Sequence, residues 1–97
     1  MFTLNVPEEM LEKLRSMREE EEDSIRLREY KLGGGCSSKF ILGLGIDEFD
    51  EDEDEKIDVQ GVPFIAEKDF LLKHGHSFEL SFNQNKEVLL NATESDM

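Results

Sequence analysis

The chain has 97 residues, the size of one small domain, and carries 24 acidic against 11 basic side chains, for a formal net charge of −13. This charge disfavours contact with nucleic acid and with anionic membrane surfaces, which both attract clustered lysine and arginine. A single cysteine excludes an internal disulfide and a zinc site made of cysteines alone. We therefore expect no nucleic acid, no membrane, and partners that are cations or proteins with basic surfaces.

Hydropathy predicts a cytoplasmic protein. The N-terminus shows no secretory apolar region, and the longest apolar run, Phe40–Ile46, is too short to span a bilayer. In the cytoplasm a lone thiol stays reduced.

The N-terminal segment predicts an amphipathic helix. Asn5 is a candidate N-cap, Pro7 falls in the first turn, and Glu8 stands where a capping box requires it. Apolar side chains then recur at helical spacing, at Val6, Met10, Leu11, Leu14 and Met17. We expect this helix to reach about Glu21 and to pack its apolar stripe on a sheet.

Two strands are expected next, on either side of a glycine-rich turn. In Ser24–Leu32 the apolar side chains change phase, which predicts a bulge near Arg28. Lys39–Ile46 alternates cleanly, as a strand with one buried face does. Gly43 and Gly45 fall on its other face, where small residues would let another backbone approach.

The C-terminal half predicts a hairpin, a short helix and a second hairpin. Gln60-Gly61 is a candidate tight turn, and Gly75 a candidate helix stop. The expected elements are strands at Ile57–Val59 and Val62–Ile65, a helix at Glu67–Lys73, strands at Phe78–Phe82 and Glu87–Leu90, and a frayed tail over 91–97. Together with the N-terminal helix they predict a single α+β domain over residues 1–97, mostly β, with a mixed or antiparallel sheet.

The glycine-rich turn holds the first candidate site. The only cysteine, Cys36, directly follows three glycines, namely Gly33, Gly34 and Gly35. Glycines leave backbone N–H groups free to approach an anion, and a thiolate or a bound sulfide is one. The turn is either a metal or sulfur site with Cys36 as ligand, or a tight connection with a chance cysteine.

Two histidines form the second candidate. His74 and His76 stand two residues apart on a segment expected to be extended, so their side chains would face the same way. With Cys36 they would supply three ligands of a transition-metal site, and a carboxylate would be the fourth. The simpler interpretation is a surface turn around Gly75. Cys36 with either histidine also has the composition of a nucleophile and a base, but no second motif supports catalysis, and we expect no enzyme.

An acidic segment, Asp47–Glu55, has eight carboxylates in nine residues and predicts a solvated loop. Its alternating aspartates suggest a calcium loop, but the EF-hand pattern requires glycine where Glu55 stands and glutamate where Gly61 stands. Weak cation binding or docking of a basic partner is the functional alternative to a solubilising loop. The residues of that docking surface would be Asp47, Glu48, Asp50, Glu51, Asp52, Glu53, Asp54 and Glu55.

Along nearly its whole length the chain resembles the HesB-like family, the A-type iron–sulfur cluster carriers. The motifs that carry the resemblance are the strand and turn "IRLREYKLGGGCSS", the strand and acidic segment after it, and "GVPFIAEKDF". The resemblance implies a twisted β-pseudobarrel of short strands with an N-terminal helix and a short second helix. It also implies binding of iron or an iron–sulfur cluster during cofactor biogenesis, often across a dimer, with other biogenesis proteins or apo-proteins as partners.

The family's ligand set is incomplete here. Family members use the cysteine of the glycine turn and two more in a C-terminal Cys-Gly-Cys, and only the first is matched, at Cys36. Iron–sulfur clusters usually have four protein ligands. His74, His76, the acidic segment, an exogenous thiol or a partner protein would have to complete the shell.

Two functions remain open from the sequence. In the first, the chain binds iron or a labile iron–sulfur cluster through Cys36. In the second, a HesB-like fold has lost metal chemistry and acts as an acidic protein-interaction module.

Overall fold

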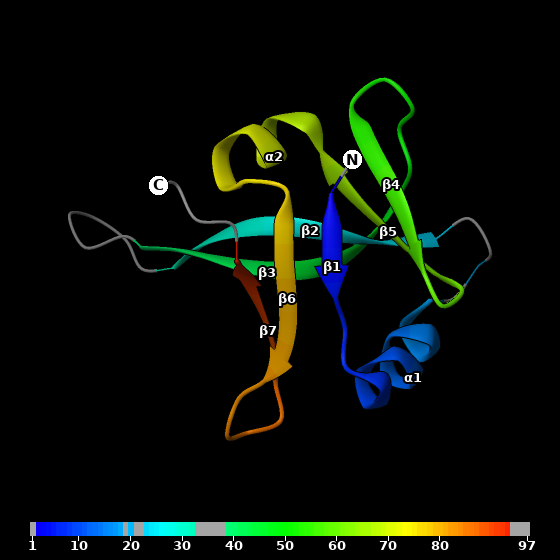
Figure 1. Cartoon of the computed structure of the whole chain (residues 1–97), viewed down its shortest axis with the longest axis vertical. Coiled ribbons are helices and arrows are strands. Elements are labelled where there is room, and N and C mark those ends of the chain that lie inside the picture. Colours follow the sequence, from blue (N-terminus) through cyan, green and yellow to red (C-terminus); the bar gives the residue numbers. More distant parts are fainter. Residues whose placement is uncertain (1, 19, 21–22, 33–38, 94–97) are drawn as a thin grey trace.

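The computed structural model of the chain describes residues 2–18, 20, 23–32 and 39–93. Within these ranges it has seven strands and two helices (Figure 1). They are β1 (Thr3–Asn5), α1 (Glu8–Met17), β2 (Asp23–Leu32), β3 (Lys39–Glu48), β4 (Asp54–Val59), β5 (Val62–Glu67), α2 (Lys68–His74), β6 (Ser77–Phe82) and β7 (Val88–Ala92).

The strands form two sheets. The smaller has the order β1-β6-β7, in which β1 is parallel to β6 and β7 antiparallel to it. The larger has the order β3-β2-β5-β4, and it is mixed because β2 and β5 pair in parallel. In Figure 1 β1 and β6 run vertically in front of β2 and β3, with α2 above and α1 below. The prediction of a mostly β fold is confirmed, and the arrangement is compatible with an α+β class; of the mixed and antiparallel alternatives, both sheets are mixed.

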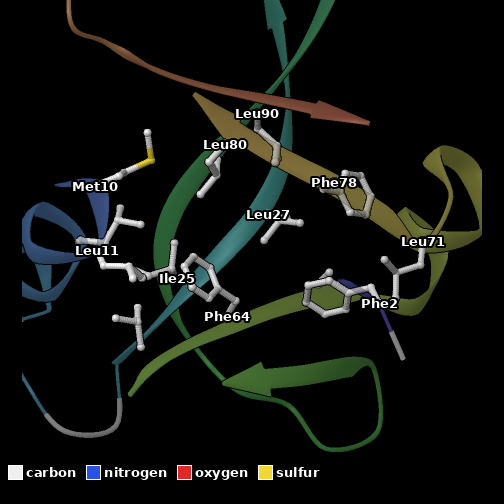
Figure 2. Packing of buried hydrophobic residues seen from close by; sticks show 13 residues of the cluster. Phe2, Met10, Leu11, Ile25, Leu27, Phe64, Leu71, Phe78, Leu80 and Leu90 are labelled. Atoms are coloured by element: carbon white, nitrogen blue, oxygen red, sulfur yellow. The ribbon is translucent and has the colours of Figure 1, made fainter. Parts of the chain in front are cut away.

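The core lies where these elements meet (Figure 2). Both sheets and both helices contribute to it, so residues from either end of the chain bury one another's apolar surface. Its buried members are Phe2, Met10, Leu11, Leu14, Ile25, Leu27, Val62, Phe64, Ala66, Leu71, Phe78, Leu80 and Leu90.

The N-terminus differs from the sequence prediction. Asn5 does not cap a helix but ends β1, a strand that the sequence analysis missed. The N-cap of α1 is Pro7, with extended backbone and no side-chain cap bond. The helix ends at Met17 rather than near Glu21, before the run of acidic residues whose mutual repulsion disfavours helix.

The bulge predicted near Arg28 is wrong, because β2 and β3 pair without interruption from Asp23↔Glu48 to Leu32↔Lys39. The change of phase has another cause: Tyr30 lies on the outer face of the sheet. There its ring covers Gly43, so a Cβ on that glycine would lie 2.7 Å from Tyr30 Cε2. The Tyr30 hydroxyl donates to the carbonyl of Leu44 at 2.9 Å. The small residues of β3 therefore admit a side chain rather than a second backbone.

The C-terminal half follows the prediction closely, except that the predicted frayed tail over 91–97 begins too early, because Asn91 and Ala92 pair with β6 as the end of β7. Gln60 and Gly61 have positive φ of 50° and 86°, as a two-residue turn between β4 and β5 requires. Gly75, with φ of 97°, ends α2 one residue beyond the predicted end. Neither helix in the described part of the chain is long and apolar enough to cross a membrane.

Candidate functional site

A groove opens between β2 and α2, and we call it the β2–α2 groove. β5 runs beside β2 only at two pairs, Ile25↔Phe64 and Arg26↔Ile65, and then turns away into α2. The space between the diverging elements measures about 360 Å³. Charged side chains dominate its lining, which also includes Leu27 and Phe70. This groove brings together one predicted site residue of α2, His74, and one of the acidic segment, Asp47.

A buried ion pair borders the groove. Arg26 Nη1 donates to Asp54 Oδ1 and Nη2 to Asp54 Oδ2, each at 2.7 Å. The two side chains are 9% and 1% exposed, respectively. Arg26 Nε also donates to Asp47 Oδ2 at 2.8 Å, and Nη2 reaches the carbonyl of Glu48 at 3.2 Å. One guanidinium thus ties β2 to the end of β3 and the start of β4.

These contacts set the charge states of the three groups. Hydrogen bonding to Asp54 is the main reason that the pKa of Arg26 lies above its already high ordinary value, against the opposing effect of burial. Burial alone would raise the pKa of Asp54, but hydrogen bonds from Arg26 and from the backbone of Asp50 outweigh it and lower that pKa. The pKa of Asp47 is also lowered, first by the backbone N–H of Glu48 and then by Arg26. All three groups are therefore charged at neutral pH.

The acidic segment is consequently not the uniform solvated loop that its composition predicts. Asp47 and Glu48 end β3, and Asp54 and Glu55 begin β4. A densely acidic stretch enters the sheet because Arg26 compensates two of its carboxylates at once. Only residues 49–53 connect the strands.

Within this short connection, hydrogen bonds fix the backbone. Asp50 Oδ1 accepts from the backbone N–H groups of Asp52 and Glu53, at 2.9 and 3.2 Å. The Asp50 N–H donates in turn to Asp54 Oδ2 at 2.9 Å. Asp47, Glu48 and Asp50 to Glu53 are exposed, whereas Asp54 is buried. Asp47, Asp50 and Asp54 make hydrogen bonds within the fold, and the role of the segment as a docking surface stays a prediction.

A second set of contacts lies on the α2 side of the groove. Lys73 Nζ donates to both carboxylate oxygens of Glu29, at 3.0 Å each. His74 Nε2 lies 3.6 Å from Glu29 Oε1, which is beyond hydrogen-bond distance. This nitrogen is buried and has no hydrogen-bond partner within the described structure. The His74 ring packs against Phe70, with centroids 4.8 Å apart.

The expectation that His74 and His76 share one face of an extended segment is wrong. His74 is the last residue of α2, and Gly75, at φ of 97°, turns the chain before His76. The backbone of His76 instead accepts a hydrogen bond from the N–H of Thr3, which joins the start of β1 to this turn. The two imidazoles therefore belong to different local structures.

The other predicted site residues, Gly33, Gly34, Gly35 and Cys36, lie outside the described residues. They fall in the connection between Leu32 and Lys39, which are paired across β2 and β3. His74 meets β2 at Glu29, three residues or roughly 10 Å of extended strand before that connection begins. No group of three or more His, Cys, Asp or Glu side chains that could hold a metal ion occurs in the described part of the chain.

Comparison with known proteins supports the resemblance found in the sequence. The chain is 39% identical over 51 residues to the iron-sulfur cluster insertion protein ErpA of Shewanella halifaxensis, and likewise to that of Shewanella pealeana. Each match covers 53% of this chain and 43% of the relative. The ErpA of Marinobacter nauticus is 39% identical over 56 residues, which are 57% of this chain and 50% of that protein.

The similarity to A-type iron–sulfur cluster carriers is thereby confirmed, and it extends over about half of the chain. The chain spans about half the length of the curated relatives it matches. No family model matches it.

Sequence reasoning missed Arg26 and the groove itself. Arg26 is one of several charged residues on β2, and its partners follow it by 21 and 28 positions. One local signal was available: Arg26 stands between Ile25 and Leu27, which both point into the core. An arginine on the opposite face of a central strand requires compensation by carboxylates.

Proposed function

We propose that this chain takes part in iron–sulfur cluster biogenesis as a HesB-like protein, with Cys36 as a ligand of iron or of a labile cluster. The observation that carries the proposal is the 39% identity to three iron-sulfur cluster insertion proteins. The cluster would be cargo rather than a resident catalytic group, so the role is that of a carrier and not of an enzyme. The cytoplasm is a suitable compartment because the thiol stays reduced there.

The arrangement of elements is compatible with the family's pseudobarrel. An N-terminal helix covers one end of two sheets, and a short second helix precedes the last hairpin, in the order that the resemblance implies. We propose that the connection between β2 and β3 presents Cys36 at the end of this hairpin. Backbone N–H groups of a glycine-rich turn would stabilise the negative charge of thiolate and sulfide.

Cluster binding would need ligands beyond one chain. One thiolate per chain gives two in a symmetric dimer, whereas clusters usually have four protein ligands. The described residues contain no further group of side chains that could hold a metal ion. The carboxylate beside His74, that of Glu29, already accepts a hydrogen bond from Lys73. We therefore propose that a homodimer, an exogenous thiol or a second biogenesis protein completes the shell. His74 and His76 are the histidines to test.

The first test is anaerobic reconstitution with ferrous iron and sulfide, followed by absorption spectra and by iron and sulfide counts per chain. The wild type should show a visible sulfur-to-iron charge-transfer band with bound sulfide. Cys36→Ser should lose both, because a hydroxyl is a poor ligand for a cluster. His74→Gln and His76→Gln are matched variants that keep the thiol, and loss of the band in one of them would identify a further ligand.

Two results would contradict the proposal. If neither the wild type nor Cys36→Ser retains iron with or without added thiol, the chain carries no cluster. If Cys36→Ser keeps the full band, the ligand is another group.

A further inference from the structure

The inner edge of β2 is open along the β2–α2 groove. β2 pairs with β3 through ten consecutive residues, but with β5 only through Ile25 and Arg26. From Leu27 to Leu32, no strand in the described part of the chain lies beside β2 on the side of α2. An unpaired strand edge offers a row of backbone donors and acceptors, to which an extended peptide can add as a further strand.

His74, which lines the groove, carries a polar atom without a hydrogen bond. His74 Nε2 is buried and lacks a hydrogen-bond partner, although buried polar side-chain atoms are normally paired. Phe70, half-buried beside it, gives the same wall an apolar surface. At about 360 Å³ the groove is large enough for a few side chains and too small for a folded domain. Its size and lining fit a short segment of chain.

The charges of the groove favour a basic occupant. Its cations already have partners, since Arg26 binds Asp54 and Asp47, and Lys73 binds Glu29. Arg28 lies over the ring of Tyr30, with 5.7 Å from Cζ to the ring centroid.

Its carboxylates are less well compensated. Glu67 is exposed, and its nearest cation is Arg26 Nη1 at 3.9 Å, the outer limit of an ion pair. Asp69 is also exposed and has no ion-pair partner among the described residues. These two carboxylates stand at the end of β5 and in the first turn of α2, where both line the groove. A cationic side chain entering the groove would meet both.

We propose that the β2–α2 groove binds an extended, basic peptide segment of a partner protein, which pairs with the edge of β2 and directs a lysine or arginine side chain to Glu67 and Asp69. A second copy of this chain, with its net charge of −13, matches the carboxylates of this groove less well than a basic partner does, which leaves open a dimer that forms through another surface. The proposal does not depend on Cys36 or on iron, so it can fail or succeed separately from the proposed function.

The probe is an acetylated and amidated seven-residue peptide of alternating valine and lysine, titrated into the full chain by isothermal calorimetry at low salt. Two control peptides are matched to it: one has glutamate in place of lysine, and the other has alternate backbone nitrogens methylated. We expect measurable binding of the lysine peptide alone, because one control reverses the charge and the other removes the donors for strand pairing.

The protein variants separate the groove from the acidic segment. Glu67→Gln with Asp69→Asn removes two charges from the groove, and Glu51→Gln with Glu53→Gln removes two from the exposed connection after β3. The groove variant should weaken binding about tenfold, because two partly exposed ion pairs are lost, and the control variant less than about twofold. Circular dichroism would confirm that both variants keep the native fold.

Hydrogen exchange of backbone amides distinguishes strand pairing from electrostatic attraction, because attraction between charges alone would not protect the amides of β2. Bound peptide should slow exchange of amides within Leu27–Lys31 on the open edge of β2, while amides of β7 stay unchanged. Equal weakening by both double variants would overturn the proposal in favour of non-specific attraction to an acidic protein. So would absence of binding, equal binding of the methylated peptide, or exchange protection confined to the acidic segment.

Discussion

Removal of Asp54 should destabilise the fold more than removal of any neighbouring carboxylate of the acidic segment. Its side chain is 1% exposed and accepts two 2.7 Å bonds from an arginine that is itself 9% exposed. Asp54→Ala leaves a buried guanidinium with part of its compensation removed. Breaking one side of a buried ion pair costs about 3–5 kcal/mol.

The structure places this substitution toward the lower end of that range. After the change, Arg26 would still donate to Asp47 at 2.8 Å and to the carbonyl of Glu48 at 3.2 Å. The Asp50 N–H would lose its acceptor. We expect a loss of about 3 kcal/mol, from a total of roughly 5–15 kcal/mol for a chain of this length. The melting temperature should fall by about 12–24 °C.

The assay is urea denaturation followed by far-ultraviolet circular dichroism at neutral pH, because the chain has no tryptophan to report by fluorescence. Asp52→Ala is the matched control: it removes the same charge from an exposed side chain two residues away and should change stability by less than about 0.5 kcal/mol. Arg26→Met combined with Asp54→Leu should recover much of the loss, since no buried charge remains unpaired.

The reasoning would be refuted if Asp54→Ala and Asp52→Ala cost the same, or if Asp54→Ala cost less than about 1 kcal/mol. A double variant whose loss equals the sum of its two single losses would show that Arg26 and Asp54 are not coupled.

Four further outcomes follow from the same structure. Folding lowers the pKa values of Asp47 and Asp54, so the stability that these carboxylates contribute is complete above the unfolded-state pKa of about 4 and is lost as the pH falls through the lower folded-state values. The difference in stability between wild type and Asp54→Asn, measured by urea denaturation, should therefore shrink from pH 6 towards about pH 2. A constant difference would contradict this. Gly43→Ala should displace the Tyr30 ring and lower the free energy of unfolding by about 1 kcal/mol, because the hydrogen bond from the Tyr30 hydroxyl to the carbonyl of Leu44 is lost. In a Tyr30→Ala background the same change should leave stability unaltered. An equal loss in both backgrounds would exclude the contact between Tyr30 and position 43 as the cause. Gly61→Ala should lower the free energy of unfolding by about 1–2 kcal/mol through backbone strain alone, because φ is +86° and no atom lies within 4 Å of the added Cβ. Gln60→Asn should instead raise the melting temperature, because asparagine adopts the positive φ of 50° at this position more readily than glutamine does.

Local features were predictable where neighbouring residues decide the structure. Gln60-Gly61 predicts a two-residue turn because glycine tolerates positive φ, and the structure has that turn between β4 and β5. Gly75 ends α2 for the same reason. The alternation of Phe78, Leu80 and Phe82 predicts one buried face, and Phe78 and Leu80 are almost fully buried in β6. None of these depends on a distant contact.

For the candidate site, the sequence allowed us to predict which residue types take part but not how they are arranged in space. The comparisons support a resemblance over about half of the chain, and the role of Cys36 in the glycine turn as a ligand stays a prediction. The shared face of His74 and His76 failed because an extended segment was assumed where α2 ends and Gly75 turns the chain. Gly75 has a φ of 97°, so the backbone between the two histidines is not the extended one that the prediction assumed.

Composition and local patterns were enough to predict a mostly β fold, its hairpins and helix stops, and the excess of negative charge. Which of the carboxylates are buried and paired could be known only from contacts between distant residues. Asp54 looks like its neighbours in the sequence, yet a guanidinium 28 positions earlier removes it from solvent. The parallel pairing of β2 with β5 is just as remote, and its early end opens the β2–α2 groove. Burial and ion pairing depend on residues that are far apart in the sequence and become neighbours only in the folded chain, so a local sequence pattern does not predict them.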